Sequence, residues 1–188
     1  PVRMSLPAVR PSVLFLFADD LRFDALGAAG NAEVVTPNLD RLAARGTRFS
    51  QCTIMGSTMP AVCCPSRAML NTGRTLYHVS RDCDDWPTLP QTLREAGYNT
   101  FGTGKWHNER NSFARSFSAG ASIFFGGMCN HMEVPCHDFD PRGEYRQELQ
   151  RVGKSFSSEL FSDAAINFLE SEPPARPSYM YVSYTAPH

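Results

Sequence analysis

A cysteine and an arginine close together in the sequence, Cys63 and Arg67, are the first candidates for chemistry. Pro65 suits the first turn of a helix, where its missing N–H costs nothing, and Gly73 is typical of a helix end. Cys63 is therefore expected at a helix N-terminus, where unpaired N–H groups favour an anion. Arg67 adds a planar, permanently charged donor that suits an oxyanion. The alternative is a buried cysteine beside a solvated arginine.

Two adjacent carboxylates, Asp19 and Asp20, follow a continuous apolar run over residues 12–18. A run without alternation is typical of a strand buried on both faces of a parallel sheet. Adjacent carboxylates at the end of such a strand repel each other and resist desolvation unless a cation lies between them. Their oxygen atoms suit calcium or magnesium, so both aspartates are candidate metal ligands. The alternative is one exposed aspartate and one helix cap.

Lysine and histidine side chains follow two other predicted strands. Lys105 and His107 come after a strand expected at 98–102, and in extended backbone they would point to the same side. They supply a fixed cation and a group that exchanges protons near neutral pH. His188 follows a strand expected at 178–184. For the Lys105 and His107 pair, the alternative is a surface lysine and a hydrogen-bonded loop histidine.

The elements that must position these residues alternate between strands and helices. Further helices are indicated by Thr36 and Pro37 at one start, by the capping-box pattern of Thr88 and Gln91 at another, and by an apolar face over 157–169. This order predicts an α/β fold with a largely parallel central sheet and helices on both faces. Ligands of such sheets bind beyond the carboxyl ends of the strands, so the candidate residues are expected at one rim.

The segment from 108 to 154 has no sustained period, which indicates an insertion or a set of substrate-facing loops. It holds Cys129, His131, Cys136 and His137, which are residue types that bind zinc, in an order that fits no spacing we can justify. The six cysteines leave a disulfide and free thiols equally open, and the redox compartment with them.

Length and composition set outer limits. The 188 residues suffice for one domain with a sizeable core. A formal net charge of −1 gives no bulk attraction to nucleic acid or to an anionic membrane. The longest apolar run, residues 13–18, is too short to span a bilayer, and the aspartates after it do not fit a signal peptide. Because the sequence starts at Pro1, an upstream signal can simply be missing from it.

The motif Cys-Cys-Pro-Ser-Arg at 63–67, followed by Thr-Gly-Arg at 72–74, resembles the signature of the type I sulfatases in the alkaline phosphatase superfamily. In that family the first cysteine of the motif is oxidised to formylglycine, and the hydrate of formylglycine is the nucleophile. The resemblance implies that Cys63 is this cysteine and that Arg67 is the motif arginine.

The other candidate residues resemble the same family. Asp19 and Asp20 match its paired aspartates, which bind a divalent cation together with the formylglycine; the cation is usually calcium, with magnesium possible. Lys105 and His107 match a Gly-Lys-x-His element that contacts the sulfate and the formylglycine hydroxyl. His188 matches a histidine that helps to bind sulfate and serves the leaving group.

The match runs closely from about residue 12 to 107 and resumes near 178. It therefore implies an alkaline-phosphatase-like fold, with residues 1–188 as the N-terminal part of a sulfatase catalytic domain. The family's later cation ligands and its second lysine are not visible in this sequence, and Asn71 replaces an apolar residue before Thr-Gly. Half of a cation site is therefore expected here.

The implied activity is hydrolysis of a sulfate monoester, with a sulfated small molecule or glycan as substrate and a formylglycine-generating maturase as partner. Arg67 and Lys105 would stabilise charge on the sulfate oxygens, His188 would protonate the leaving alcohol, and His107 would be the base for the second hydroxyl. The family resemblance implies a periplasmic, extracellular or lysosome-like compartment, and the sequence itself leaves the localisation open.

Two other functions remain open. Related enzymes with formylglycine hydrolyse phosphonate monoesters or phosphate diesters, and the residues that would bias the choice are not in this sequence. A non-catalytic remnant that binds a cation or an anionic glycan is the second alternative, and it predicts that Cys63 stays a thiol. An α/β domain of unrelated purpose would account for each motif as a chance match.

Overall fold

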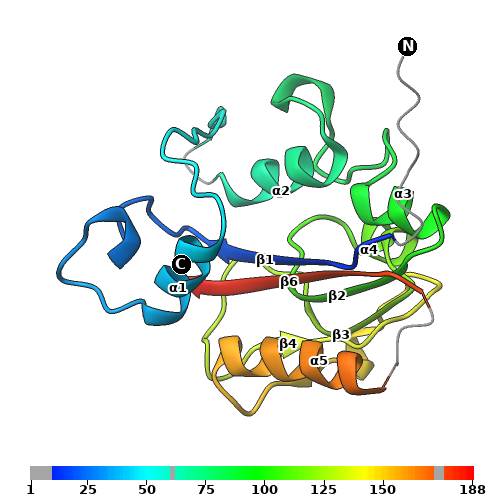
Figure 1. The fold of residues 1–188 in the computed structure, drawn as a ribbon. Coiled ribbons are helices and arrows are strands. Elements are labelled where there is room, and N and C mark those ends of the chain that lie inside the picture. The colour runs from blue at the N-terminus through cyan, green and yellow to red at the C-terminus, as the bar shows by residue number, and fades with distance from the viewer. Residues whose placement is uncertain (1–9, 60–61, 172–175) are drawn as a thin grey trace.

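The structure is a computed structural model that describes residues 10–59, 62–171 and 176–188 (Figure 1). A four-stranded sheet lies at its centre, with the strands in the order β1-β6-β2-β3. The strands are β1 (Val13–Asp19), β6 (Ser178–Pro187), β2 (Asn99–Lys105) and β3 (Ala119–Phe124). All three pairings are parallel, which confirms the predicted α/β fold.

The strand β6 carries apolar side chains on both faces of the sheet. Met180 and Val182 belong to the buried cluster that α5 (Ser157–Ser171) contributes to, whereas Tyr179 and Tyr181 belong to a second cluster. Side chains alternate across a strand, so the two clusters lie on opposite faces. Each face therefore needs its own helical cover.

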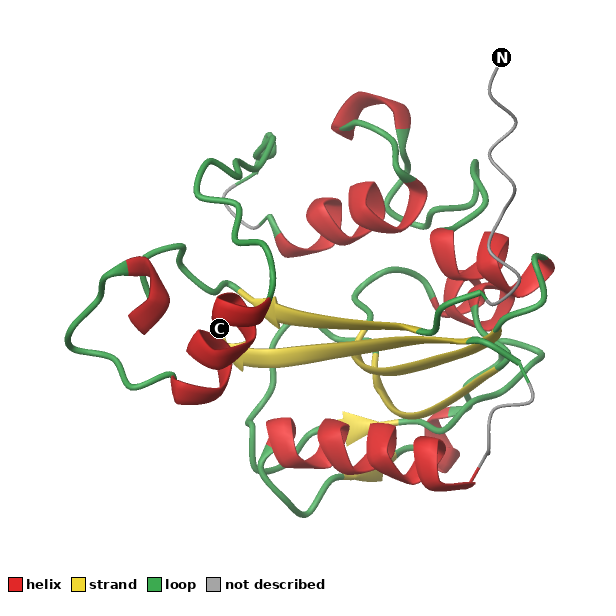
Figure 2. Ribbon diagram, in the orientation of Figure 1, coloured by secondary structure: helices red, strands yellow, loops and turns green. Residues whose placement is uncertain are grey.

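Helices cover both faces of the sheet, as predicted. α5 lies on one side, and α2 (Cys63–Thr72), α3 (Leu89–Glu95) and α4 (Arg110–Ser116) lie on the other (Figure 2). On the side of α2, the ring of Trp106 packs edge-on against aromatic rings from α4 and its C-terminal end, and it is completely buried. This packing fixes the chain directly after β2.

The strand β1 differs from the prediction of burial on both faces. Phe15 stacks on Tyr181 of β6, but Leu14 is 56% exposed and Leu16 is 49% exposed. These side chains are exposed because β1 is an edge strand of the sheet and α5 packs mainly on β6 and β2. The apolar run predicted the strand correctly but not its place in the sheet.

The cap of α1 (Pro37–Arg45) also departs from the sequence pattern. Thr36 precedes the helix, yet its hydroxyl accepts a hydrogen bond from the Gly27 N–H at 2.8 Å and donates to the carboxylate of Asp40, instead of capping the helix. Thr36 therefore ties α1 to the short 3-10 helix η1 (Gly27–Ala29).

The cap of α3 follows the pattern only in part. Thr88 accepts a hydrogen bond from the Gln91 N–H at 3.3 Å, as a capping residue does. The side chain of Gln91 donates to Glu95 instead of returning to Thr88, so the capping box is only half formed.

The segment that gave no sustained period is more than an insertion or a set of loops. It contains α4 and β3, the fourth strand of the sheet. It also contains an antiparallel pair, β4 (Pro135–Cys136) and β5 (Arg151–Val152), and the 3-10 helix η3 (Gln147–Leu149). A further 3-10 helix, η2 (Leu76–His78), follows α2.

Within the described residues, none of the helices has the length and apolar character needed to cross a bilayer.

Candidate functional site

Three parallel strands end beside one buried carboxylate, that of Asp19. Asp19 ends β1, Lys105 ends β2, and His188 directly follows β6. The ammonium of Lys105 contacts Asp19 Oδ2, and His188 Nδ1 lies 3.1 Å from the same oxygen. Lys105 Nζ and His188 Nδ1 are 3.5 Å apart. The structure therefore brings three of the predicted site residues together at the carboxyl rim of the sheet.

Arg67 reaches the same carboxylate from α2. Its Nη2 lies 3.6 Å from Asp19 Oδ1. Its Nη1 donates to the backbone carbonyl of Lys105 and to two hydroxyls of β6, those of Ser183 and, at 3.3 Å, Tyr181. Arg67 and Lys105 are both completely buried. Two buried cations face one carboxylate, so the site keeps an excess of positive charge that favours an anion.

The guanidinium of Arg67 also has unused donors. Among the described residues, its buried Nε and Nη2 have no hydrogen-bond partner. A buried N–H without an acceptor is costly, and a tetrahedral oxyanion presents oxygen atoms that fit a guanidinium edge. The arrangement is suited to hold an anion against Arg67.

The charges at the site fix the ionisation of Asp19. Burial opposes its ionisation, but the hydrogen bond from Lys105 and the positive charge of Arg67 outweigh burial, so the pKa of Asp19 is lowered. Asp19 is therefore a carboxylate at neutral pH and at mildly acidic pH.

His107 lies close to the same charges but outside the extended backbone that was expected. β2 ends at Lys105, and His107 has a φ of +58°, in the left-handed region that non-glycine residues seldom adopt. The expected arrangement, with both side chains on one side of a strand, is therefore not formed.

The imidazole of His107 is half-buried, and its Nδ1 has no hydrogen-bond partner among the described residues. Burial and the positive charges of Lys105 and Arg67 lower the pKa of His107 to about 4. The ring is therefore neutral at physiological pH and can accept a proton. It packs so tightly against Gly127 that a side chain there would meet the ring at 2.9 Å.

Cys63 begins α2, as predicted, and faces a cavity of about 550 Å³ at the rim of the sheet. The cavity wall also includes Asp19, Asp20, Ser66 and His188. The remaining wall is mostly apolar, with residues from β1, from α2 and from the loop before α2: Phe17, Ala18, Leu21, Cys52, Ile54, Val62 and Leu70. Cys63 and the two aspartates therefore share one cavity.

The two aspartates fit part of a divalent cation site. Both line the cavity, and Asp20 has a φ of +62°, so the backbone turns sharply where the first carboxylate is followed by the second. Carboxylate oxygens are the donors that calcium and magnesium prefer. Within the described residues, however, no group of three or more histidine, cysteine, aspartate or glutamate side chains could hold a metal. Asp19 and Asp20 are therefore the carboxylates of the described chain that could contribute to such a site, which stays a prediction.

Sequence reasoning missed the residues that hold His188. His131 Nε2 lies 3.1 Å from the backbone carbonyl of His188, and His131 Nδ1 lies 2.9 Å from the hydroxyl of Ser157. Thr185 donates to the same serine hydroxyl at 2.9 Å. The serine that begins α5 and the threonine within β6 gave no signal in the sequence.

The zinc pattern around Cys129 and Cys136 has a different explanation. His131 binds Ser157 and His188 as described, and Cys136 is buried in the apolar cluster beside α5. All six cysteines lie in the described part of the chain, and each is a free thiol.

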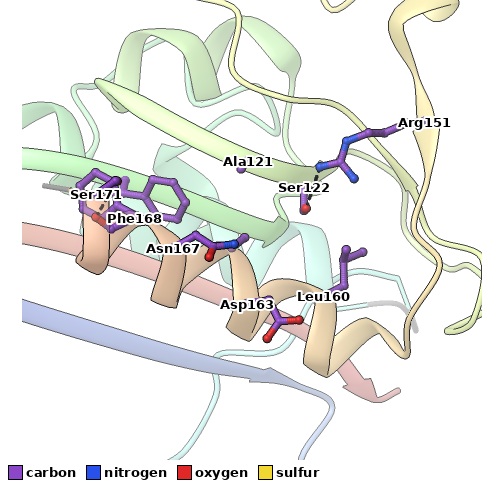
Figure 3. A pocket seen from close by; sticks show the side chains of 10 residues that line it. Ala121, Ser122, Arg151, Leu160, Asp163, Asn167, Phe168 and Ser171 are labelled. Atoms are coloured by element: carbon purple, nitrogen blue, oxygen red, sulfur yellow. Dashed lines mark hydrogen bonds between the residues drawn. The ribbon is translucent and has the colours of Figure 1, made fainter.

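A second depression lies between α5 and β3, and Figure 3 shows its side chains. Leu160, Asp163, Asn167 and Phe168 project from α5, and Arg151 donates to Ser122 of β3. None of the residues predicted for catalysis lines this depression. It is therefore separate from the site at the strand ends.

The fold and the site together define an α/β protein with a buried, positively charged cluster at the carboxyl ends of parallel strands. Comparison with known families gives a match to the sulfatase family over residues 11–188. The chain belongs to the sulfatase family.

Among its relatives, an N-acetylglucosamine-6-O-sulfatase of Bacteroides thetaiotaomicron is 32% identical over 187 residues, which cover 95% of this chain and 31% of the relative. Arylsulfatase A of Bos taurus is 40% identical over 143 residues, which cover 68% of this chain and 27% of the relative. The chain thus spans about a third of the length of these relatives.

The fold matches solved structures as well. A protein solved in complex with its substrate, D-glucosamine-2-N,6-O-disulfate, superposes with a TM-score of 0.80 at 28% identity and covers 96% of this chain and 35% of the other. The expected alkaline-phosphatase-like fold is thereby confirmed.

Proposed function

We propose that the protein to which this chain belongs hydrolyses a sulfate monoester, with residues 1–188 as the N-terminal part of its catalytic domain. The observation that carries the proposal is the buried cluster of Arg67, Lys105 and Asp19 beside His188, with unused Arg67 donors and Cys63 in the adjoining cavity. Sulfated sugars are the proposed substrates, because one relative is a sugar sulfatase and a solved relative binds a sulfated glucosamine.

Cys63 is proposed to be converted to formylglycine by a maturase. The hydrate of formylglycine supplies two hydroxyls on one carbon, one to attack sulfur and one whose deprotonation releases sulfate. Asp19 and Asp20 would hold the calcium ion, or a magnesium ion, which supplies positive charge for ionising a hydroxyl and neutralising oxygen charge.

The other residues act on the sulfate and on protons. Arg67 and Lys105 bind the non-bridging sulfate oxygens, whose charge grows in the transition state. His188 gives a proton to the departing alcohol oxygen, and the neutral imidazole of His107 takes a proton from the hydroxyl left behind. The lowered pKa of His107 supports this assignment, because the ring must be unprotonated before it can accept.

The test is the mass of the peptide that spans Cys63, taken from the full-length protein produced with an active maturase. We expect an aldehyde at position 63, turnover of an aryl sulfate, and no turnover in a Cys63→Ala variant that folds normally. A thiol at position 63 despite an active maturase would instead favour a non-catalytic binding protein. Faster turnover of an aryl phosphonate than of the aryl sulfate would favour the phosphonate alternative.

A further inference from the structure

A third cavity, separate from the one that Cys63 lines, has in its wall Asn108, the residue after His107. It has a volume of about 340 Å³, which is within the range of ligand-binding pockets. Its wall includes Arg81, Asn108 and Arg110 together with the apolar residues Phe124, Phe125 and Pro135. We call it the Arg81–Arg110 cavity.

The two arginines that name the cavity have no carboxylate partner within 4.0 Å in the described parts of the chain. Arg110 is held in place nonetheless, since it donates to the backbone carbonyl of Tyr145 and its guanidinium lies over the ring of Phe125 at 5.5 Å. Glu109 is exposed, and one glutamate against two arginines leaves the cavity positive. A positive cavity with a fixed arginine favours an anion.

Asn108 contributes a buried acceptor. It is only 5% exposed, and its Nδ2 donates to the backbone carbonyl of Arg81 at 2.7 Å and faces that of Cys64 at 3.5 Å. These contacts fix the orientation of the amide, because the nitrogen faces two carbonyl oxygens. The Oδ1 atom is buried and has no donor among the described residues. A hydroxyl or N–H of a ligand would satisfy it.

One residue of the Arg81–Arg110 cavity, Asn108, adjoins residues of the candidate active site. Asn108 directly follows His107, and its amide contacts Cys64, which directly follows Cys63. The wall of the Arg81–Arg110 cavity therefore contacts the start of α2, where Cys63 lies.

We propose that the Arg81–Arg110 cavity binds an anionic sugar unit of the substrate, adjacent to the unit whose sulfate ester is cleaved. The arginines take the carboxylate or sulfate of that unit, and Asn108 Oδ1 accepts from one of its hydroxyls. The apolar walls from Phe124, Phe125 and Pro135 suit the C–H faces of a sugar ring. This inference rests on the proposed function, because that proposal places the cleaved sulfate ester at the candidate active site.

The test is a titration of the full-length protein with three methyl glycosides: glucuronate, glucose 6-sulfate and neutral glucose. The wild type is compared with Arg110→Gln and Arg81→Gln, and with Arg146→Gln as control, because Arg146 is an exposed arginine of the same segment that pairs with Glu144. We expect an anionic sugar to bind more tightly than glucose. This preference should fall about tenfold or more in each cavity variant, as for loss of a charge-assisted hydrogen bond, and stay unchanged in the control.

The stronger of the two anionic ligands identifies the charged group. Equal binding of all three sugars, no binding of either anionic sugar, or a preference that survives both cavity substitutions would overturn the proposal. Turnover of 4-nitrophenyl sulfate, which has no second sugar, is measured in parallel in the wild type and should be unchanged in the Arg146→Gln control. Absence of that turnover in the wild type counts against the proposed function alone, since the titration judges the cavity independently.

Discussion

At the scale of single residues, the candidate catalytic residues are kept in position by hydrogen bonds from neighbouring residues. Arg67 is anchored to Ser183 and Tyr181 and keeps two donors unused, and His188 is held through its backbone by His131. A catalytic group must sit within a fraction of an ångström of its productive position. The supporting contacts are therefore expected to contribute to the proposed activity.

His131 is expected to act as a positioning residue for His188. Replacing His131 by Ala removes one hydrogen bond, so kcat should fall about threefold to tenfold with little change in KM. Replacing it by Gln, whose amide can still donate to the His188 carbonyl, should restore most of the loss. The measurement is steady-state kinetics of the full-length enzyme with an aryl sulfate.

His137→Gln is the matched control for His131, since His137 lies in the same segment and its side chain contacts Gln150 instead of His188. Wild-type kcat in His131→Ala, or a His131→Gln variant no better than His131→Ala, would contradict the positioning role.

His107 should make the fold sensitive to mild acid. Its pKa is about 4 in the folded protein, because of burial and the charges of Lys105 and Arg67, and about 6.5 in an unfolded chain. Between these values the unfolded state binds the proton and the folded state does not, so stability falls as the pH drops below 6.5. The melting temperature of the full-length protein should fall less between pH 7 and pH 5 in His107→Gln than in the wild type. Equal falls in the two proteins would argue against a buried neutral imidazole.

At the scale of elements, the sequence patterns located β1, β2, β6, α2 and α5, because apolar runs and helix caps are local signals. They missed β3, where Gly120 and Ser122 interrupt the apolar character, and α4, which shows one aromatic residue among polar ones. They also missed the backbone of His107, because a left-handed conformation at a residue other than glycine has no local signal in the sequence.

Close packing between β2 and β6 gives an element-scale prediction at Gly104. Its φ is +85°, and a Cβ atom there would overlap the backbone carbonyl of Ser183 on the paired strand. Gly104→Ala therefore combines backbone strain with a clash against backbone and should destabilise the fold by about 3 kcal/mol or more. Chemical denaturation of the full-length protein measures this.

Gly46→Ala is the control for Gly104→Ala. Gly46 follows α1 with a φ of −129°, and an added Cβ would lie 3.4 Å from its nearest neighbour, the Leu42 carbonyl. We expect a change below about 1 kcal/mol there. Similar losses in both variants would mean that β2 and β6 are less closely packed than described.

At the scale of the whole molecule, acidic groups of high pKa are buried away from the site. Burial raises the pKa of Cys83 and of Cys136 to about 12, and it raises the pKa of Tyr145 and Tyr179 as well. Cys136 and Tyr179 belong to the two apolar clusters on opposite faces of the sheet. Both faces thus contain groups whose deprotonation is opposed by burial.

The consequence is loss of stability in alkaline solution. Above about pH 9 the unfolded chain loses protons from these thiols while the folded chain keeps them, so stability falls with rising pH, by at most about 1.4 kcal/mol per pH unit for each group. The free energy of unfolding of the full-length protein should therefore decline between pH 8.5 and pH 10.5. The decline should be shallower in Cys136→Ala, although that variant starts from a lower stability because of the cavity. Cys52→Ala, which changes an exposed thiol, should keep the wild-type slope.

Labelling with iodoacetamide at pH 8.5 gives an independent measurement of the burial of Cys136. The native protein should react at Cys52, and Cys136 should react only on unfolding. Labelling of Cys136 in the native protein would show that its face of the sheet is open to solvent.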